Sequence, residues 1–325
     1  MRTSVVIPCR NAVEFIGATL ASVLAQDHAD LELIVVDDGS TDGSGQEIAR
    51  FGERVRAVTV PHGGACRARN VGLALATGDA VIFLDADDLL RPDTVGALTA
   101  ELERAGASAL IAAPWRRLKQ VAKTWQPAPS GVPDRAPDGD PLRAWISGWF
   151  VPPCALLWPK QLLERVGGWD PELTVNQDGD LVMRALIAGA RLVHVSTGES
   201  LYRLHGAERR SVSQGHGQAD ARSRARVLEK VVGALRTADR LEAYRITLGR
   251  AYHDLARIYF DRFPELARAC EREATALGGA RSVSGPLAHR LAYRLLGLAG
   301  KDRLARWLGR RGVGRPGRRA ASRGP

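Results

Sequence analysis

The chain has 325 residues, a length that suggests either about two domains or one large α/β domain with an additional segment. Hydrophobic residues make up 45% and charged residues 25% of the chain, as in an average globular protein, which excludes wholesale disorder and a collagen-like chain. No apolar stretch reaches the roughly 18 residues that a membrane span needs, and no secretory signal is recognised. We therefore expect a cytoplasmic protein.

The net charge of +10 is concentrated at the end of the chain. Residues 286–325 hold eleven basic residues and one acidic residue, whereas basic and acidic residues are balanced in the part before them. A body without excess charge disfavours nucleic acid as a partner. The four cysteines are scattered without a metal-binding spacing, which favours reduced cysteines: Cys9, Cys66, Cys154 and Cys270.

Strand and helix patterns alternate over the first 113 residues. We expect strands at 5–8, 31–36, 54–60, 80–84 and 108–113, and helices at 11–26, 65–76 and 92–104. This alternation predicts an α/β fold with a mostly parallel sheet and helices on both faces. Ligands of such sheets bind beyond the carboxyl ends of the strands.

The later segments are more mixed. The composition of 126–141 predicts a loop, and the elements expected after it are a strand at 156–158, helices at 160–166 and 178–188, and strands at 191–194 and 200–204. Residues 218–277 have the spacing of two or three helices. An amphipathic basic helix is expected at 287–308, followed by a low-complexity end at 309–325.

Polar clusters follow three of the expected strands: Cys9-Arg10-Asn11, Asp37-Asp38 and Asp85-Ala86-Asp87. The last of these can hold a divalent cation through two carboxylates, as Mg²⁺ or Mn²⁺ sites do, or it can be a polar turn that caps the next helix. The Asp37-Asp38 turn can likewise be an Asx turn or can accept a hydrogen bond from a nucleotide base. Neither a P-loop nor a G-x-G-x-x-G fingerprint is present.

Several segments resemble the inverting family 2 glycosyltransferases in order and spacing. They are Ser4–Asn11, Ser22–Gln26, Glu32–Ser44, Ala68–Leu73 and Phe83–Asp88, with looser matches at Val166–Asp170, Gln177–Leu181 and Tyr202–His205. The resemblance covers about two-thirds of the chain and implies a GT-A fold. It divides the chain into a glycosyltransferase domain at 1–215, a helical extension at 216–285 and a basic tail at 286–325. Within that domain, 1–113 would bind the nucleotide sugar and 114–215 the acceptor.

The resemblance also assigns roles to residues on the donor side. Asp38 would contact uracil with Asp37 beside it, Asp85 would lie near the ribose and the sugar, and Asp87 would bind a divalent metal. His205 either completes the metal site or is a surface histidine. The remaining nucleotide-binding positions are Pro8, Arg10, Asn11 and Arg69.

On the acceptor side, Asp178 matches the general base of the family. The preceding glutamate of the family is replaced here by Gln177, and the aromatic residue that often follows is replaced by Gly179. Asp180 is the competing candidate for the base, and Asp170 lies nearby. Six tryptophans between 115 and 169 either pack the second half of the domain or offer a surface for sugar stacking, above all Trp169 and Trp149.

These residues predict an inverting transfer of a sugar from a nucleoside-diphosphate sugar, expected to be a UDP-sugar, to a hydroxyl of a saccharide, lipid-linked or other acceptor. The setting would be the assembly of cell-surface polysaccharide or glycoconjugate. A carboxylate takes the hydroxyl proton, and a divalent Mn²⁺ or Mg²⁺ stabilises the leaving diphosphate. The alternatives are an inactive sugar- or nucleotide-binding relative and a nucleotidyltransferase. Residues 286–325 either bind an anionic membrane peripherally, on the inner face of the plasma membrane, or end the chain as a packed helix with a solvated tail.

Overall fold

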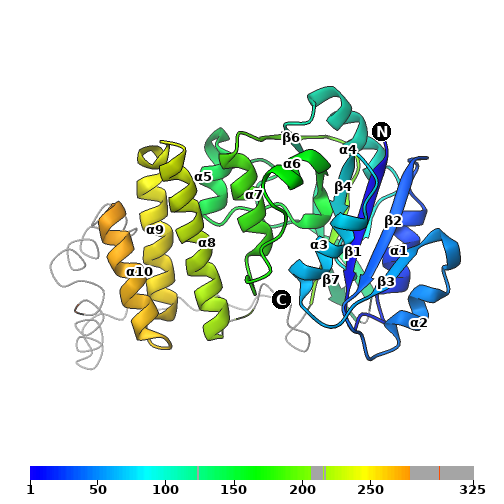
Figure 1. Ribbon diagram of the computed structural model, residues 1–325, viewed down its shortest axis with the longest axis horizontal. Helices are drawn as coiled ribbons and strands as arrows, with labels where there is room; N and C mark the ends of the chain where they lie inside the picture. The colour runs from blue at the N-terminus through cyan, green and yellow to red at the C-terminus, as the bar shows by residue number, and fades with distance from the viewer. Residues whose placement is uncertain (123, 206–214, 216, 279–299, 301–325) are drawn as a thin grey trace, which may run out of the picture. The chain divides into compact units, whose positions relative to one another are not determined.

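The computed structural model describes residues 1–122, 124–205, 215, 217–278 and 300. These belong to two compact units, residues 1–242 and 243–325. The centre of the first unit is a seven-stranded sheet whose strands lie in the order β10-β6-β9-β4-β1-β2-β3 (Figure 1). In that order the strands are Arg191–His194, Ala109–Ala112, Leu156–Pro159, Ala80–Phe83, Thr3–Cys9, Leu31–Asp37 and Arg56–Thr59. All pairs are parallel except those of β9 with β4 and β6, which confirms the predicted α/β sheet.

Helices cover both faces of this sheet, because successive side chains of a strand point to opposite sides. On one face, α3 (Ala65–Leu75) approaches β1 so closely that a Cβ on Gly72 would lie 2.2 Å from Val6 Cγ1. On the other face, Thr3 of β1 shares a 3.0 Å hydrogen bond with Thr99 of α4 (Thr94–Ala105). The remaining helices between the early strands are α1 (Ile16–Leu24) and α2 (Ser44–Ala49).

A second sheet has the strand order β5-β11-β7-β8, and β11 contributes to the lining of a cavity. Its strands are Leu89–Leu90, Ser200–Leu204, Trp115–Val121 and Thr124–Ala128. Our expectation of a loop over 126–141 is wrong in part, because β8 forms its beginning and Asp140 caps α5 (Pro141–Ile146) through its side chain at its end. The strand pairing of a hairpin and an N-cap overrode the Pro- and Gly-rich composition here.

Three further helices belong to the first unit: α6 (Lys160–Arg165), α7 (Gln177–Ile187) and α8 (Gln218–Thr237). The unit extends beyond residue 215, where we expected the transferase domain to end, since α8 belongs to it. Ser223 of α8 donates to the carbonyl of Val175 at 2.8 Å, and Lys230 lies 2.6 Å from Asp180 of α7. These contacts explain why α8 is part of the compact first unit.

The second unit begins within α9 (Leu241–Tyr259) and contains α10 (Pro264–Leu277), so the helical spacing of 218–277 resolves into three helices. Arg245 Nη1 donates to the carbonyl of Leu277 at 3.0 Å. The expected basic helix at 287–308 and the end at 309–325 lie outside the described residues, apart from residue 300. Among the helices that the structure describes, none is long and apolar enough to cross a bilayer.

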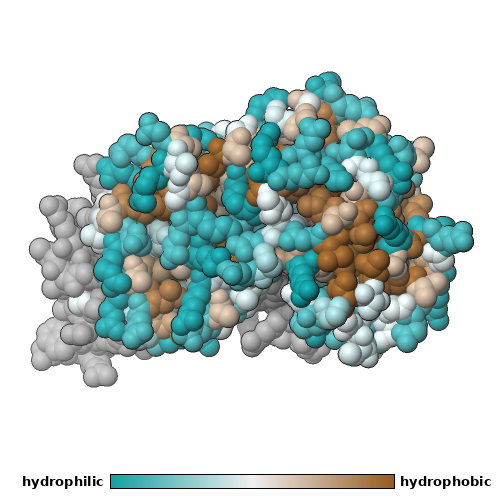
Figure 2. Space-filling view, viewed as in Figure 1, coloured by the Kyte–Doolittle hydropathy of each residue, from teal (hydrophilic) through white to brown (hydrophobic). Residues whose placement is uncertain are grey.

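Burial follows the order of the strands in the sheet. The central strands β1, β2 and β4 are almost fully buried, whereas β3 at the sheet edge exposes most of its residues. In the view of Figure 2, hydrophobic residues gather over the part of the sheet formed by β1 to β3. The four cysteines are free and buried, as expected for reduced cysteines.

Candidate active site

A cavity of about 610 Å³ opens at the carboxyl ends of β1, β2 and β4. Its walls come from the loops after these strands, from α3, from the segment that leads into α7 and from β11. The structure thus brings together most of the residues that the sequence singled out: Pro8, Arg10, Asp38, Arg69, Asp85, Asp87, Trp169, Gln177, Asp178 and His205. Both predicted halves of the transferase domain contribute to this cavity.

Two of the predicted nucleotide-binding residues, Asn11 and Asp37, do not line the cavity. Asn11 adopts a left-handed backbone conformation with φ of 48°, and its side-chain oxygen accepts from the backbone of Thr41 at 2.8 Å. Asp37 accepts from the backbone of Ser40 at 2.9 Å. In this structure both side chains therefore shape the turns after β1 and β2.

Asp38 marks one end of the cavity and is 3% exposed. Its carboxylate accepts hydrogen bonds from the backbone of Gly63 at 2.7 Å and of Gly64 at 2.9 Å. It also contacts His62 Nδ1 at 2.8 Å, while His62 Nε2 bonds Arg10. Because arginine can only donate, Nε2 is the acceptor, and Nδ1 carries the proton shared with Asp38. Sequence reasoning missed His62, since no motif marks the loop before α3.

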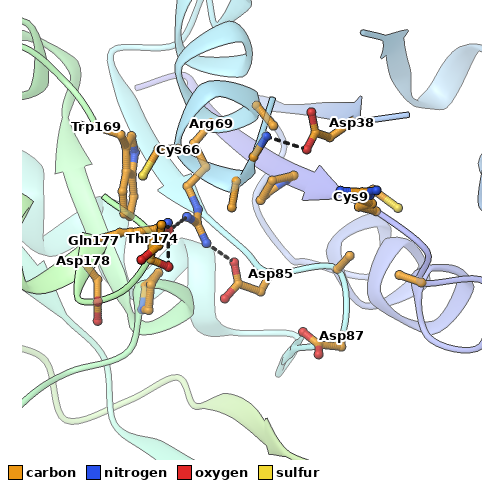
Figure 3. Close-up of a pocket in the computed structure, with 18 of the residues that line it drawn as sticks. Cys9, Asp38, Cys66, Arg69, Asp85, Asp87, Trp169, Thr174, Gln177 and Asp178 are labelled. Atoms are coloured by element: carbon orange, nitrogen blue, oxygen red, sulfur yellow. Dashed lines mark hydrogen bonds and ion pairs between the residues drawn. The ribbon is translucent and has the colours of Figure 1, made fainter. Parts of the chain in front are cut away.

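Arg69 occupies the middle of the cavity (Figure 3). Its Nη2 donates to Asp85 at 2.6 Å and its Nη1 to Gln177 at 3.0 Å. The guanidinium also lies 4.4 Å from the centre of the Trp169 ring, a cation–π distance. With 6% exposure, Arg69 is a buried charge whose position is fixed from three sides.

Of the three acids Asp170, Asp178 and Asp180, which lie in α7 or in the segment before it, only Asp178 lines the cavity. Asp180 is fully buried against Arg184 at 2.6 Å and Lys230 at 2.6 Å. Asp170 also pairs with Lys230, at 2.8 Å. The Lys230 pair of Asp180 joins α7 to α8, and that of Asp170 joins the segment before α7 to α8, and neither carboxylate lines the cavity.

The half-buried carboxylate of Asp178 has a raised pKa. Burial is the main cause and Asp85 adds to it, while the N–H of Gly179 and the charge of Arg69 favour the ionised form. A higher pKa makes a carboxylate a stronger base. The environment of Asp178 therefore suits the removal of a proton from a bound hydroxyl.

Asp87 also lines the cavity, and its Oδ2 lies 2.6 Å from His205 Nε2. The imidazole of His205 packs edge-on against Phe15 and Trp125, with ring centres 5.2 and 5.6 Å away. No group of three or more His, Cys, Asp or Glu side chains suitable for a metal occurs in the part of the chain that the structure describes. A carboxylate and an imidazole side by side nevertheless fit an ion that draws its other ligands from a bound diphosphate.

Two further residues lie beside this pair: Arg203, which the sequence offered as an additional cation for the leaving diphosphate, and Asp88, to which it assigned no role. The Arg203 guanidinium lies against the rings of Phe15 and Trp125, 4.8 Å from each centre, and donates to the carbonyl of Asp87. Asp88 is buried and accepts from the backbone N–H of Arg203 at 2.7 Å. Burial raises the pKa of Asp88 well above the ordinary value. The sequence did contain a sign of this contact, because Asp88 is a third acid directly after the Asp85-Ala86-Asp87 segment.

The remaining candidates belong to the packing of the domain. Trp149 is buried, donates to the carbonyl of Pro133 at 2.8 Å and does not line the cavity, unlike Trp169. Burial raises the pKa of the Cys9 thiol to about 12 and that of Cys66 to about 11. Both thiols are therefore protonated at neutral pH and unsuited to act as nucleophiles.

Comparison with known proteins agrees with this geometry. The family model for glycosyl transferase family 2 matches residues 4–160. An uncharacterized glycosyltransferase of Nostoc sp. is 28% identical over 236 residues, which cover 69% of this chain and 72% of that protein. TuaG of Bacillus subtilis, assigned to teichuronic acid biosynthesis, is 43% identical over 94 residues, which cover 28% of this chain and 37% of TuaG.

A solved structure resembles the fold over nearly the whole chain. The crystal structure of S. aureus TarS 1–349 in complex with UDP-GlcNAc superposes with a TM-score of 0.69 and covers 96% of this chain and 92% of that one. The sequence identity is 18%, so this likeness shows the fold alone, the GT-A arrangement predicted from the motifs. Residues 4–160 of this chain thus resemble glycosyltransferase family 2, and the D-x-D segment and Asp178 face one cavity.

Proposed function

We propose that this glycosyltransferase moves a sugar from a UDP-sugar to an acceptor hydroxyl with inversion at the anomeric carbon. The observation that carries the proposal is that Asp38, the Asp85–Asp87 segment and Asp178 all face one cavity. The complex of TarS with UDP-GlcNAc, a protein of similar fold, supports the choice of donor. TuaG supports a setting in the assembly of polysaccharide or glycoconjugate.

The donor would lie along the carboxyl ends of the strands. In this proposal, Pro8, Arg10 and Asp38 hold the nucleoside, and Arg69 and Asp85 lie near the ribose and the sugar. The predicted contribution of Asn11 and Asp37 would be indirect, through the two turns that they shape.

Asp87 and His205 would hold a divalent Mn²⁺ or Mg²⁺ together with the diphosphate of the donor. When bound, such an ion neutralises charge that develops on the leaving diphosphate. The chain adds a cation of its own beside the metal position, since Arg203 is held beside Asp87. Its guanidinium is held against two aromatic rings and would need little reorganisation during the reaction.

The transfer would be a single displacement. The acceptor oxygen forms a bond to the anomeric carbon while the bond from that carbon to the diphosphate oxygen breaks, and the electron pair leaves with the diphosphate. Asp178 takes the proton of the acceptor hydroxyl. One attacking oxygen and no covalent sugar–enzyme intermediate give inversion.

The acceptor would lie between the donor and α7, against Trp169 and Gln177. The face of the Trp169 ring already stacks on Arg69, which keeps the ring fixed beside the cavity. The acceptor class remains a hydroxyl of a saccharide or a lipid-linked saccharide. As part of the same proposal, residues 286–325 would bind an anionic membrane surface, on the grounds of their eleven basic residues.

The test is UDP release from a panel of UDP-sugars by the full chain with Mn²⁺, with and without saccharide acceptors. Asp178→Asn should reduce transfer by roughly 10²- to 10⁴-fold, the range that a positioned base contributes. Glu172→Gln is the matched control, because Glu172 is exposed and lies outside the cavity lining.

An unchanged transfer rate in Asp178→Asn would remove Asp178 as the base. Tight UDP binding by a wild-type chain that turns over no UDP-sugar would instead favour the inactive binding relative.

A further inference from the structure

Gln177 is the first residue of α7, and both ends of its side-chain amide are engaged. Its Oε1 accepts from Arg69 Nη1 at 3.0 Å. Its Nε2 donates to the carbonyl of Leu173 at 2.8 Å and reaches that of Thr174 at 3.4 Å. The side chain thus folds back over the loop that precedes its own helix.

These contacts require an amide. A carboxylate at this position could still accept from Arg69, but it has no proton to donate and would place an anionic oxygen against two carbonyl oxygens. A methionine would fill the same space and make neither kind of bond. A comparison of glutamine, glutamate and methionine at position 177 therefore separates the two roles of the side chain. One is to accept a hydrogen bond from Arg69, and the other is to donate to the carbonyls of Leu173 and Thr174.

The loop held by Gln177 belongs to the cavity wall. Leu173, Thr174 and Asn176 all line the cavity, and Asn176 begins α7 in a left-handed conformation with φ of 56°. On the other side of Gln177, the Arg69 guanidinium is fixed by Asp85 and by the Trp169 ring. Gln177 therefore connects a residue held by the donor side of the site to the loop and helix that carry Asp178 (Figure 3).

We propose that Gln177 is a positioning residue that sets the acceptor loop 173–176 and the general base against the donor, and that its neutral amide is required for this. The proposal rests on the function proposed for Asp178. It predicts that a glutamate here, although it is the usual residue of the family, would make this enzyme slower.

The neutrality of the Gln177 amide also affects the pKa of Asp178. The groups that act on the Asp178 carboxylate are the charges of Arg69 and Asp85 and the backbone N–H groups of Gly179 and of Asp178 itself, with the protonated Cys66 thiol within electrostatic reach. A carboxylate at 177 would add a further negative charge next to Asp178. Like charges disfavour ionisation, so the pKa of Asp178 would rise.

The experiment compares Gln177→Glu and Gln177→Met with wild type in the full chain, using readouts that need no known acceptor. Hydrogen exchange reports on the 173–176 backbone amides, and carbon NMR of the carboxyl groups gives the pKa of Asp178. Calorimetry with UDP and Mn²⁺ measures the donor side. Gln46→Glu and Gln46→Met on the exposed surface of α2 are the matched controls.

We expect exchange in 173–176 to accelerate by about three- to tenfold in both Gln177 variants, the effect of one lost hydrogen bond. The pKa of Asp178 should rise clearly in Gln177→Glu, whereas it should rise less in Gln177→Met. UDP affinity should stay within about twofold, as the donor contacts are on the other side of Arg69.

Two results would overturn the proposal. One is that the amides of 173–176 exchange at the wild-type rate in both Gln177 variants, and the other is that the pKa of Asp178 is equal in Gln177→Glu and Gln177→Met. These two readouts do not depend on turnover. Failure of the wild-type chain to transfer sugar would therefore count against the proposed function, whereas the exchange and pKa measurements would still decide the role of Gln177.

Discussion

Asp178 and Asp180 lie two positions apart but have opposite effects on stability. Burial raises the pKa of Asp178 in the folded chain above its unfolded value, so the folded state binds the proton more tightly. Stability is thus favoured below the unfolded pKa and is lost as the pH rises through the folded pKa. At pH 7 the charged side chain costs stability, and Asp178→Asn should raise the melting temperature. A lower melting temperature of Asp178→Asn would contradict the conclusion that the ionised Asp178 carboxylate costs stability.

Asp180→Asn should have the reverse effect. It would leave Arg184 and Lys230 without their shared carboxylate, and breaking a buried ion pair costs about 3 kcal/mol when the cations are partly exposed. For a domain of this size the melting temperature should fall by roughly 6–12 °C. Thermal unfolding measured beside Asp178→Asn provides the comparison, and an unaffected Asp180→Asn would show that the ion pairs do not hold α7 to α8.

The pH dependence of transfer follows from the same carboxylate. Asp178 must be ionised to accept the proton, so the rate falls as the pH drops through its pKa. Because burial raises that pKa, the acid limb should lie at higher pH than an exposed aspartate would give. The measurement is kcat against pH at saturating donor and acceptor. An acid limb at or below the pKa of an ordinary aspartate would place the base elsewhere.

At the scale of elements, the start of α7 depends on two residues that fit each other. A Cβ on Gly179 would lie 2.1 Å from Asn176 Oδ1, so the Asn176 side chain occupies the space that a larger residue at 179 would need. The lack of a side chain at 179 therefore leaves room for the Asn176 side chain at the start of α7. Gly179→Ala should therefore slow transfer by displacing the helix start that carries Asp178.

The double variant Asn176→Gly/Gly179→Ala tests that explanation, since glycine keeps the left-handed conformation and removes the clashing oxygen. We expect it to recover part of the lost rate. Equal rates in the single and double variants would show that Asn176 is not the obstacle.

The packing of α3 on the sheet gives a second prediction at this scale. Gly72→Ala would press a methyl group against Val6, and overpacking of this kind costs about 1–3 kcal/mol. Gly233→Ala in α8 is the control, because a Cβ there meets nothing within 4 Å and should stabilise the chain by about 0.4–1 kcal/mol. Denaturant unfolding compares the two. A neutral Gly72→Ala would mean that α3 can move away from β1.

For the whole molecule, the elements that could be predicted from the sequence are those marked by a local or repeated residue pattern. The apolar runs of β1, β2 and β4 and the acids that follow them indicated both the sheet and its ligand edge. The hairpin of β7 and β8 was not predicted, because its pairing overrides a composition typical of loops. The resemblance favoured Asp178 over Asp180 as the base, but the ion pair of Asp180 with Lys230 of α8, far along the chain, could not be predicted.

The basic tail at 286–325 carries the net charge of the whole chain. Deleting residues 286–325 removes eleven basic residues and should weaken binding to anionic vesicles while leaving UDP binding unchanged. Vesicle sedimentation at low and high salt measures this. Persistent vesicle binding by the shortened chain would assign the membrane contact to another surface.

The most direct test of the proposed donor site is calorimetry of the full chain with UDP and with GDP, each with and without Mn²⁺, repeated on Asp87→Asn. We predict that UDP binds more tightly than GDP, that tight binding needs the metal, and that Asp87→Asn loses the metal dependence. Metal-independent binding would contradict the role given to Asp87, and equal binding of both nucleotides would contradict the role given to Asp38.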